Sequence, residues 1–236
     1  MTHSITTIAF DADDTLWHNE RFFKLTQDHF ASLLADYVEG PDLMGRLLEA
    51  ERRNILHYGF GIKGFVLSMI ETALDITDGR VPQHVIRDLV ETGKDMLAHP
   101  IELLPHAREA VEIAKVFGRV LIITKGDLLH QERKVAQSGL GDLFDGVEIV
   151  SDKVAKTYTR IFDAAGDGAA RGMMIGNSMK SDVRPMIDAG GWGVFVPHDL
   201  SWDIEHAEEP TDHPRFRKID DLGQLPDLLS DLSKTG

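Results

Sequence analysis

The sequence predicts an α/β protein in which an open parallel-sheet core is interrupted by an inserted all-α domain. Short apolar runs of the type buried inside a parallel sheet alternate with amphipathic helical segments over most of the chain. One long stretch, residues 17–100, departs from this alternation because it contains helical patterns and no convincing strand. The length of 236 residues is sufficient for an α/β core with one modest insertion.

Five apolar runs predict the strands of the sheet. They are rich in β-branched residues or methionine, and the longer ones lack the polar alternation of a strand with one face in water. Strands of this kind are buried on both faces, as in a parallel sheet covered by helices. The runs are Ile5–Phe10, Val120–Thr124, Val147–Val150, Met173–Ile175 and Val194–Val196.

Amphipathic segments separate these runs and predict the helices that connect parallel strands. A strand, a helix and a second strand in this order form the βαβ unit of an open α/β sheet. The predicted helices of the core are Ala107–Phe117, Leu128–Gln137, Thr157–Ala165, Asp182–Ala189 and a closing helix at Leu222–Leu232, which follows a loop-like stretch at Ala207–Arg215.

The stretch after the first strand predicts a separate helical domain. We expect residues 17–100 to form this domain, and residues 1–16 and 101–236 to form the α/β core. Breaks that contain glycine, and in one case proline, separate the helical patterns of the insertion. These patterns run over Arg21–Tyr37, Leu43–His57, Phe65–Leu74 and His84–Leu97.

The composition excludes several classes of partner and chemistry. The chain has 25 Lys and Arg residues against 39 Asp and Glu residues, a formal net charge of −14, and no extended basic stretch. We therefore expect neither nucleic acid nor an anionic membrane as a partner. The chain has no cysteine, which excludes disulfides and a cysteine nucleophile. It shows no signal-peptide pattern and no long apolar run, so we expect a cytoplasmic protein.

A cluster of carboxylates follows the first predicted strand. Asp11, Asp13 and Asp14 lie at the carboxyl end of this strand, where ligands bind in an open α/β sheet. Three neighbouring like charges repel one another, and one carboxyl group takes up a proton unless a cation neutralises the set. An all-oxygen set of ligands favours a hard divalent ion, and we expect Mg²⁺.

Polar residues also follow two other predicted strands. Thr124 ends the second strand and leads through Lys125 and Gly126 into a helix, and its hydroxyl and the backbone N–H groups there suit an anion. Asn177 follows the fourth strand, and Asp182 lies a few residues further on. Because the strands are parallel, we expect these groups to form one site at one edge of the sheet.

These residues resemble the motifs of the haloacid-dehalogenase-like (HAD) hydrolase superfamily. The run Asp11-Ala12-Asp13-Asp14-Thr15-Leu16 is similar to the first motif, D-x-D-x-T-L after a hydrophobic strand, and Thr124 is similar to the strand-terminal Ser or Thr of the second. The third motif is a lysine at the start of a helix. The fourth, G-[DN]-x-x-x-x-D, is matched by Gly176–Asp182. The resemblance implies a Rossmann-like core with a helical cap inserted between the first two motifs.

The resemblance also implies the chemistry of a phosphatase. Asp11 would be the nucleophile that forms an aspartyl-phosphate, and Asp13 would protonate the leaving alcohol and then activate water. Asp11, the backbone carbonyl of Asp13, and Asp182 would hold Mg²⁺, with a further oxygen from Asn177. The phosphate oxygens would be bound by Thr124, Lys125, Gly126 and the lysine of the third motif.

Two lysines compete for the third motif, because neither precedes the proline that is usual in the family. Lys156 has the familiar spacing to Ile161 and Phe162. Lys153 lies in the loop after the third strand, and its longer separation from Gly176 suits a full helix and turn. We therefore expect Lys153 at the site, with Lys156 as the alternative.

Two further positions depart from the usual motifs of the family. Asp14 stands in the place of a glycine, where it is expected to cap the chain's exit into the insertion. Asn177 stands at a position that the family fills with Asp or Asn. Asparagine keeps an oxygen for a metal ion but removes one negative charge, so we expect metal binding to be retained.

The expected substrate is a small phosphorylated metabolite, and the sequence predicts no oligomeric state. Asp13 favours a phosphatase over a dehalogenase, because the release of a halide needs no acid. A phosphonatase of the same superfamily needs a Schiff-base lysine, for which Lys24, Lys63 and Lys94 are candidates. A non-enzymatic phospho-accepting module is the alternative from another class, although its phosphorylated aspartate ends a later strand.

The insertion contains one candidate segment for substrate selection. The glycine-rich stretch Tyr58–Gly64 separates two helical patterns and carries an aromatic residue and a cation. We hypothesise that Arg52, Tyr58 and Lys63 contact the leaving group of the substrate. An ordinary helix–helix turn is the alternative, and His18 and His57 are weaker candidates for a place near the site.

Overall fold

The computed structural model describes residues 4–38, 40–200 and 202–234, and it divides into two compact units. The first unit comprises Met1–Glu20, Ile101–Lys125 and Gln131–Gly236. The second comprises Arg21–Pro100 and Gly126–His130. The prediction of an α/β core with an inserted helical domain is confirmed.

The junction between the core and the insertion lies at Glu20 rather than at residue 16. Trp17 is fully buried in the hydrophobic core of the first unit, and its backbone pairs with that of Leu103. The backbone N–H of His18 donates to the carbonyl of Glu102 at 3.0 Å. These contacts hold residues 17–20 in the first unit, because burial of the indole and pairing of the backbone stabilise them there.

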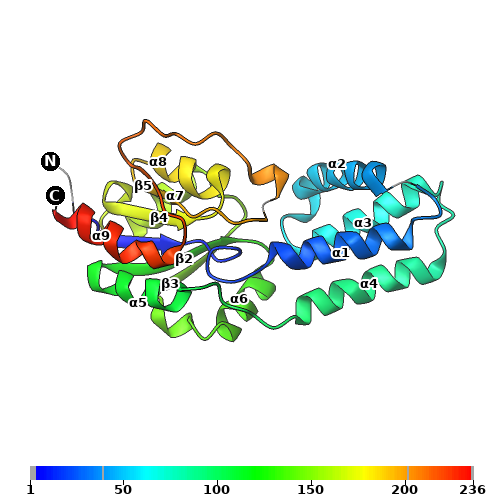
Figure 1. Cartoon of the computed structure of the whole chain (residues 1–236), viewed down its shortest axis with the longest axis horizontal. Coiled ribbons are helices and arrows are strands. Elements are labelled where there is room, and N and C mark those ends of the chain that lie inside the picture. Colours follow the sequence, from blue (N-terminus) through cyan, green and yellow to red (C-terminus); the bar gives the residue numbers. More distant parts are fainter. Residues whose placement is uncertain (1–3, 39, 201, 235–236) are drawn as a thin grey trace. The chain divides into compact units, whose positions relative to one another are not determined.

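In the described part of the first unit, six parallel strands form one sheet in the order β3-β2-β1-β4-β5-β6 (Figure 1). β1 lies inside the sheet, with β2 and β4 as its two neighbours. The loops that follow these three strands are therefore brought together at one edge. The strands are β1 (Thr7–Phe10), β2 (Arg119–Lys125), β3 (Gly146–Val150), β4 (Gly172–Gly176), β5 (Trp192–Phe195) and β6 (Phe216–Lys218).

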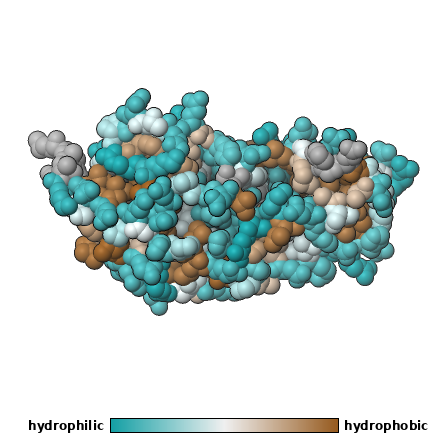
Figure 2. Space-filling view, in the orientation of Figure 1, coloured by the Kyte–Doolittle hydropathy of each residue, from teal (hydrophilic) through white to brown (hydrophobic). Residues whose placement is uncertain are grey.

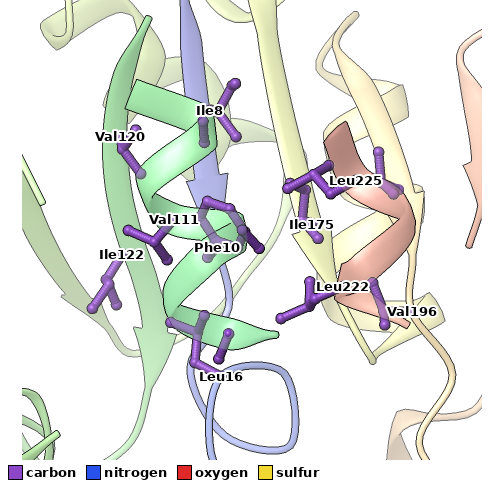
Figure 3. Close-up of a cluster of buried hydrophobic side chains, with 14 of the residues drawn as sticks. Ile8, Phe10, Leu16, Val111, Val120, Ile122, Ile175, Val196, Leu222 and Leu225 are labelled. Atoms are coloured by element: carbon purple, nitrogen blue, oxygen red, sulfur yellow. The ribbon is translucent and has the colours of Figure 1, made fainter. Parts of the chain in front are cut away.

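Helices cover both faces of this sheet. On one face, Ile8 and Phe10 of β1 pack into a cluster that includes Val111 of α5 and Leu225 of α9 (Figure 3). On the other face, Ala9 packs into a cluster that includes Phe162 of α7 and Met186 of α8. This two-sided burial explains the continuous apolar runs of the central strands. The helices are α5 (Ala107–Phe117), α6 (Leu128–Gln137), α7 (Ala155–Ala164), α8 (Arg184–Asp188) and α9 (Leu225–Lys234).

Two details of the core differ from the prediction. The sixth strand, β6, was not predicted, because it is three residues long at the edge of the sheet and buries only Phe216. The helix expected at Asp182–Ala189 is preceded by a π-helical turn, Met179–Val183. The turn forms because the backbone N–H of Val183 reaches the carbonyl of Ser178, five residues earlier, at 3.2 Å. π-Helical turns are rare and are frequent at functional sites.

The second unit contains four helices in its described residues. They pack their apolar faces together around Phe30, Leu47, Met69 and Leu89, all of which are buried. α1 ends before the predicted Tyr37, because Leu34 is the last buried residue of its apolar stripe and Tyr37 is 47% exposed. The helices are α1 (Glu20–Leu33), α2 (Gly40–Tyr58), α3 (Ile62–Ile76) and α4 (Gln83–Ala98).

Among the described residues, no helix combines the length and the apolar character that crossing a bilayer requires. Figure 2 shows the hydrophobic residues on this face as separate patches among hydrophilic ones.

Candidate active site

Asp11 lies immediately after β1 and is buried at the edge where the strand ends converge. Its backbone N–H donates to the carbonyl of Ile175 in β4 at 2.8 Å, which fixes the start of the loop. One carboxylate oxygen, Oδ1, accepts a hydrogen bond from Lys153. The other, Oδ2, accepts one from the hydroxyl of Thr15 at 3.2 Å. The predicted nucleophile is thus held in one orientation by two partners.

Lys153 is the lysine that the structure places beside Asp11. It lies in the loop between β3 and α7, its side chain is 2% exposed, and its Nζ also contacts Asp182 Oδ1 at 2.7 Å. Burial by itself would lower the pKa of Lys153, but the charges of Asp11 and Asp182 outweigh it and raise the pKa above its usual value. The alternative, Lys156, is exposed in the first turn of α7.

The charges around Asp11 are not balanced. Burial is the main cause that raises the pKa of Asp11 to about 7; Lys153 lowers it, and the nearby carboxylates of Asp182 and Asp13 raise it further. A carboxyl group in this position gains a proton readily unless a second cation is present. The site therefore favours the binding of a further positive charge next to Asp11.

Asp13 lies two residues further on, in a network of donors. Its Oδ1 accepts from the indole Nε1 of Trp17 and from Lys134 Nζ, both at 2.8 Å. Its Oδ2 accepts from Gln131 Nε2 at 3.1 Å. Burial would raise the pKa of Asp13, but the charge of Lys134 and these three hydrogen bonds outweigh it and lower the pKa. Asp13 is therefore a carboxylate in the free protein.

Gln131 and Lys134 were not predicted as site residues. Both lie on α6, three positions apart, so that they project from the same side of the helix. That side also buries Val135 in the hydrophobic core. A glutamine and a lysine on the apolar face of an amphipathic helix were the signal in the sequence, because such residues are seldom buried without a partner.

Thr124 connects the Asp13 network to the end of β2. Its side chain is buried, and its Oγ1 accepts from Gln131 Nε2 at 2.7 Å. Gln131 therefore bridges Asp13 and Thr124. Gly126 has a φ of +139°, which favours glycine, and it begins the short segment Gly126–His130 of the second unit. Asp127 caps α6 by accepting from the N–H of His130 at 3.1 Å, as expected.

The loop after β4 is built tightly around Asp182. The Ser178 N–H donates to Asp182 Oδ2 at 2.9 Å, and Asp182 is 1% exposed. A Cβ on Gly176 would lie 2.2 Å from the same carboxylate oxygen, so only glycine fits there. Tyr158 of α7, which was not predicted, donates its hydroxyl to the Ser181 carbonyl at 2.8 Å. Burial, followed by the charge of Asp182, raises the pKa of Tyr158.

The residues predicted to hold Mg²⁺ separate into two groups. With its amide nitrogen turned toward them, Asn177 lies 3.3 Å from Asp11 Oδ2 and 3.2 Å from the Asp13 carbonyl oxygen. Asp182 instead shares Lys153 with Asp11, and its Oδ1 accepts from Lys153 Nζ at 2.7 Å. The described residues contain no group of three His, Cys, Asp or Glu side chains arranged for a metal. A cation here would thus be held by one or two carboxylates together with carbonyl and amide oxygens.

This donor set fits Mg²⁺ chemically. In the orientation with Asn177 Oδ1 toward Thr15, the amide oxygen, a carboxylate oxygen of Asp11 and the carbonyl oxygen of Asp13 face one another. Hard oxygens that converge in this way are the ligands Mg²⁺ prefers. Rotation of the amide supplies an N–H instead, which stabilises the same oxygens without a metal.

Lys125 and Glu205 form a further part of the site. Lys125 Nζ contacts Glu205 Oε1 at 2.7 Å and donates to Ser181 Oγ at 2.8 Å. Lys125 was predicted as a phosphate ligand, whereas Glu205 was not predicted at all. Glu205 lies in a short 3₁₀ turn, Asp203–Glu205, far along the chain from the motifs, and no pattern in its surroundings distinguishes it from a solvated loop carboxylate.

Asp14 caps the start of the first helix of the insertion, as expected. It has a φ of +59°, and its carboxylate accepts from the backbone N–H groups of Asn19 and Glu20 at 2.8 and 2.9 Å. Burial is the main cause that raises the pKa of Asp14 to about 6, against the opposing effect of these hydrogen bonds and of His198. The rings of His18 and His198 pack edge to face, with 6.1 Å between their centroids.

The residues hypothesised to contact the leaving group lie in the second unit. Tyr58 donates its hydroxyl to Glu71 at 2.8 Å, and Lys63 pairs with Asp127 at 2.8 Å. Arg52 is exposed on α2. The ring of His57 lies next to that of Tyr58. A role for these residues in substrate selection stays a prediction.

Comparison with known proteins identifies the family. A model of the haloacid dehalogenase-like hydrolases matches residues 5–190. The chain belongs to this family. As an HAD-like hydrolase it is an enzyme, which sets aside the non-enzymatic phospho-accepting module. A comparison with curated protein sequences finds no match.

Three solved structures resemble this HAD-like hydrolase over nearly its whole length. A haloacid dehalogenase-like family hydrolase from Xanthomonas campestris is 40% identical, with a TM-score of 0.88 over 98% of this chain and 93% of that one. The putative HAD-hydrolase YfnB from Bacillus subtilis, bound to magnesium, is 15% identical, with a TM-score of 0.68 over 96% and 99%. L-2-haloacid dehalogenase from Xanthobacter autotrophicus is 18% identical, with a TM-score of 0.66 over 96% and 98%. The last two share the fold alone.

Proposed function

We propose that this HAD-like hydrolase is a Mg²⁺-dependent phosphatase that hydrolyses a small phosphorylated metabolite through an aspartyl-phosphate. The observation that carries the proposal is the second carboxylate of the site, Asp13, which three hydrogen-bond donors hold two residues after Asp11. The displacement of an alcohol from phosphorus needs an acid for the leaving oxygen, whereas the displacement of a halide from carbon does not.

Asp11 is the nucleophile in this proposal. A carboxylate oxygen of Asp11 attacks the phosphorus, a bond forms between them, and the bond from phosphorus to the ester oxygen breaks. Lys153 and Thr15 hold the two oxygens of Asp11 in place before the reaction, which reduces the entropy that the attack requires.

Asp13 transfers the protons. A bound phosphate dianion raises the pKa of Asp13, because a neighbouring like charge disfavours the carboxylate, and Asp13 takes up a proton from solvent. The carboxyl group then protonates the leaving alkoxide and becomes a carboxylate. In the second step the carboxylate takes a proton from a water molecule, whose oxygen attacks the phosphorus. The bond from phosphorus to Asp11 breaks and inorganic phosphate leaves. The pKa of Asp13 then falls again, Asp13 releases its proton to solvent, and both residues are carboxylates as at the start.

The remaining polar groups suit the phosphate oxygens. Lys153 supplies a buried positive charge next to Asp11, and Thr124 supplies a hydroxyl at the end of the neighbouring strand. Such donors stabilise the negative charge of the equatorial oxygens in the transition state. Gly126 and Lys125 follow Thr124 directly, and the charge of Lys125 is shared with Glu205.

Mg²⁺, when bound, neutralises negative charge shared by the nucleophile and the phosphate. The site holds four carboxylates and only three ammonium groups, which leaves an excess of negative charge and supports the need for a cation. Asp11, the Asp13 carbonyl and Asn177 are the groups that would hold it, with Asp182 beside them. The carboxylates are Asp11, Asp13, Asp182 and Glu205, and the lysines are Lys125, Lys134 and Lys153.

The contacts of the candidate lysines do not favour a phosphonatase. A lysine that forms a Schiff base must lose its proton, and burial is the usual means of lowering its pKa. Lys24, Lys63 and Lys94 have side chains that are 54%, 56% and 63% exposed, and each pairs with a carboxylate. None of the three is buried in the way that a Schiff-base role requires.

Hydrolysis of p-nitrophenyl phosphate tests the proposal. The wild-type protein is expected to be active with Mg²⁺ and inactive with EDTA, and Asp11→Asn and Asp13→Asn are expected to lose about a hundredfold or more in kcat. Asp188→Asn, on the exposed end of α8, is the matched control and should keep full activity. A 2-haloacid in the same assays tests the dehalogenase alternative. Metal-independent turnover, or chloride release that survives Asp13→Asn, would contradict the phosphatase proposal.

A further inference from the structure

Glu205 joins the two loops that flank Asp11. Its Oε1 contacts Lys125, which follows Thr124 at the end of β2. Its Oε2 accepts from Ser178 Oγ at 2.6 Å and from Ser181 Oγ at 2.5 Å, both in the loop after β4. β2 and β4 are the two neighbours of β1 in the sheet. One carboxylate thus connects the loops on either side of the predicted nucleophile.

The contacts of this carboxylate form a closed ring. Lys125 Nζ donates both to Glu205 and to Ser181 Oγ, and Ser181 Oγ in turn donates to Glu205. The side chains of Lys125 and Glu205 are only 12% and 17% exposed. Burial would raise the pKa of Glu205, but Lys125 and the two serines outweigh it and lower the pKa to about 2. Glu205 is therefore a carboxylate in the folded protein, and its contacts are largely shielded from water.

The backbone of the same turn is also anchored. Lys180 Nζ donates to the Ile204 carbonyl at 2.9 Å, and Ser178 Oγ lies 3.4 Å from the Glu205 carbonyl oxygen. Both donors belong to the loop that carries Asn177 and Asp182. Glu205 therefore approaches the site as part of a fixed turn and not as a loose surface side chain.

The residues in contact with Glu205 are sequence neighbours of site residues. Ser178 follows Asn177, and Ser181 precedes Asp182, so a shift of either serine moves a predicted metal or lysine partner. Glu205 compensates the charge of Lys125, so Lys125 is a weaker ligand for phosphate than a free lysine would be. Its contacts instead connect the end of β2 to the loop after β4. Glu205 can therefore affect the reacting groups only through the residues that it contacts.

We propose that Glu205 is a positioning residue of the active site, which locks Lys125 to the Ser178–Ser181 loop and thereby fixes both loops around Asp11. The proposal deepens the phosphatase function above and rests on it. Outer groups that orient the residues around a metal typically change activity by about 10- to 100-fold when they are removed. We expect Glu205 to act on kcat, because it orients reacting groups and does not itself contact the substrate.

Glu205→Gln is the appropriate variant, because it keeps the shape of the side chain and removes its charge. The amide has only one oxygen, so it can accept either from Lys125 or from the two serines, but not from both sides. Its NH₂ group faces the other side, which loses its acceptor. The matched control is Glu209→Gln in the same segment, which breaks an ion pair with Lys218 at 2.7 Å whose side chains are 33% and 44% exposed. Both variants lose one carboxylate, but only one of them lies in the site.

Three measurements test the proposal on the full chain. With p-nitrophenyl phosphate and Mg²⁺, Glu205→Gln is expected to lower kcat about tenfold or more with less than about a threefold change in KM, while Glu209→Gln changes neither. Hydrogen exchange should accelerate in the peptide that covers residues 177–183 of Glu205→Gln alone. The double variant Lys125→Met, Glu205→Gln should lose less activity than the product of the two single losses, since the residues act as a pair.

The outcomes separate this inference from the proposed function. Wild-type kcat and wild-type exchange in Glu205→Gln would overturn the inference and leave the phosphatase proposal intact. A lower melting temperature with unchanged kcat would also overturn it, since the residue would then be structural only. If the wild type hydrolyses no phosphate ester, the proposed function fails, and the exchange difference alone decides whether Glu205 holds the loops.

Discussion

Lys153 offers a direct test of the charge arrangement in the site. Lys153→Met keeps most of the side-chain volume and removes the ammonium group that contacts both Asp11 and Asp182. The three side chains are 2%, 9% and 1% exposed, so solvent cannot replace the lost charge. Breaking a buried ion pair in this way costs about 3–5 kcal/mol of folding free energy, because the remaining charges are left buried without compensation.

The loss is expected to depend on pH with a defined sign. Burial and Asp182 already raise the pKa of Asp11 to about 7 in the folded protein, and removal of Lys153 takes away the main group that lowers it. A group whose pKa is higher in the folded state binds its proton more tightly there, so it stabilises the fold increasingly as the pH falls through that pKa. In EDTA, Lys153→Met should therefore be most destabilised at pH 8 and should recover part of the loss by pH 5.5.

Urea unfolding at several pH values measures this effect, and Lys156→Met is the matched control. Lys156 is exposed three residues further on, and its loss should change the free energy of unfolding by less than about 0.5 kcal/mol. Lys153→Met should also abolish phosphatase activity under the proposed function. Equal stability of the two variants at pH 8, or a loss that grows as the pH falls, would refute the reasoning.

Three further changes test other parts of the site. Gly176→Ala should destabilise the protein by about 1–3 kcal/mol in urea unfolding and lower kcat, because the new Cβ would lie 2.2 Å from a buried carboxylate oxygen. Its control is Gly45→Ala in α2, where a new Cβ meets nothing within 4 Å, and this variant should be as stable as the wild type or more stable. Tyr158→Phe should cost about 1–3 kcal/mol, measured by thermal unfolding, because it leaves a buried carbonyl without its donor. Lys134→Met should lower kcat about tenfold with little change in KM, measured with p-nitrophenyl phosphate, because Asp13 loses the charge that orients it.

The sequence was sufficient for the architecture because each central strand is buried on both faces. An apolar run such as that of β2 has few other stable environments in a protein of this length. β6 was not predicted, because an edge strand of three residues with one buried side chain shows no detectable hydrophobic periodicity. The π-helical turn was missed for a different reason. It depends on the hydrogen bond from the Val183 N–H to the Ser178 carbonyl five residues earlier, which hydrophobic periodicity does not record.

The site was predictable to the extent that its residues follow strands. Asp11 and Asn177 come directly after strands, Thr124 lies near the end of β2, and parallel pairing alone brings them to one edge. Lys134 was detectable in principle as a lysine on an apolar helix face. Glu205 was not detectable, because its contacts depend on the path of a long loop. The sequence of that loop has no feature that distinguishes it from an ordinary solvent-exposed loop.

The site's charges make the proposed binding of Mg²⁺ and of phosphate mutually dependent. Four carboxylates against three lysines give this edge an excess of negative charge, which repels a phosphate dianion as long as no divalent ion is present. Burial, together with the charges of Asp182 and Asp13, raises the pKa of Asp11 to about 7, and a dianion without Mg²⁺ would add a further like charge next to it. By linkage, each ligand then raises the affinity of the other by the same factor. Inorganic phosphate should therefore bind measurably with Mg²⁺ in calorimetry and hardly at all with EDTA; equal binding in both would show that the lysines suffice.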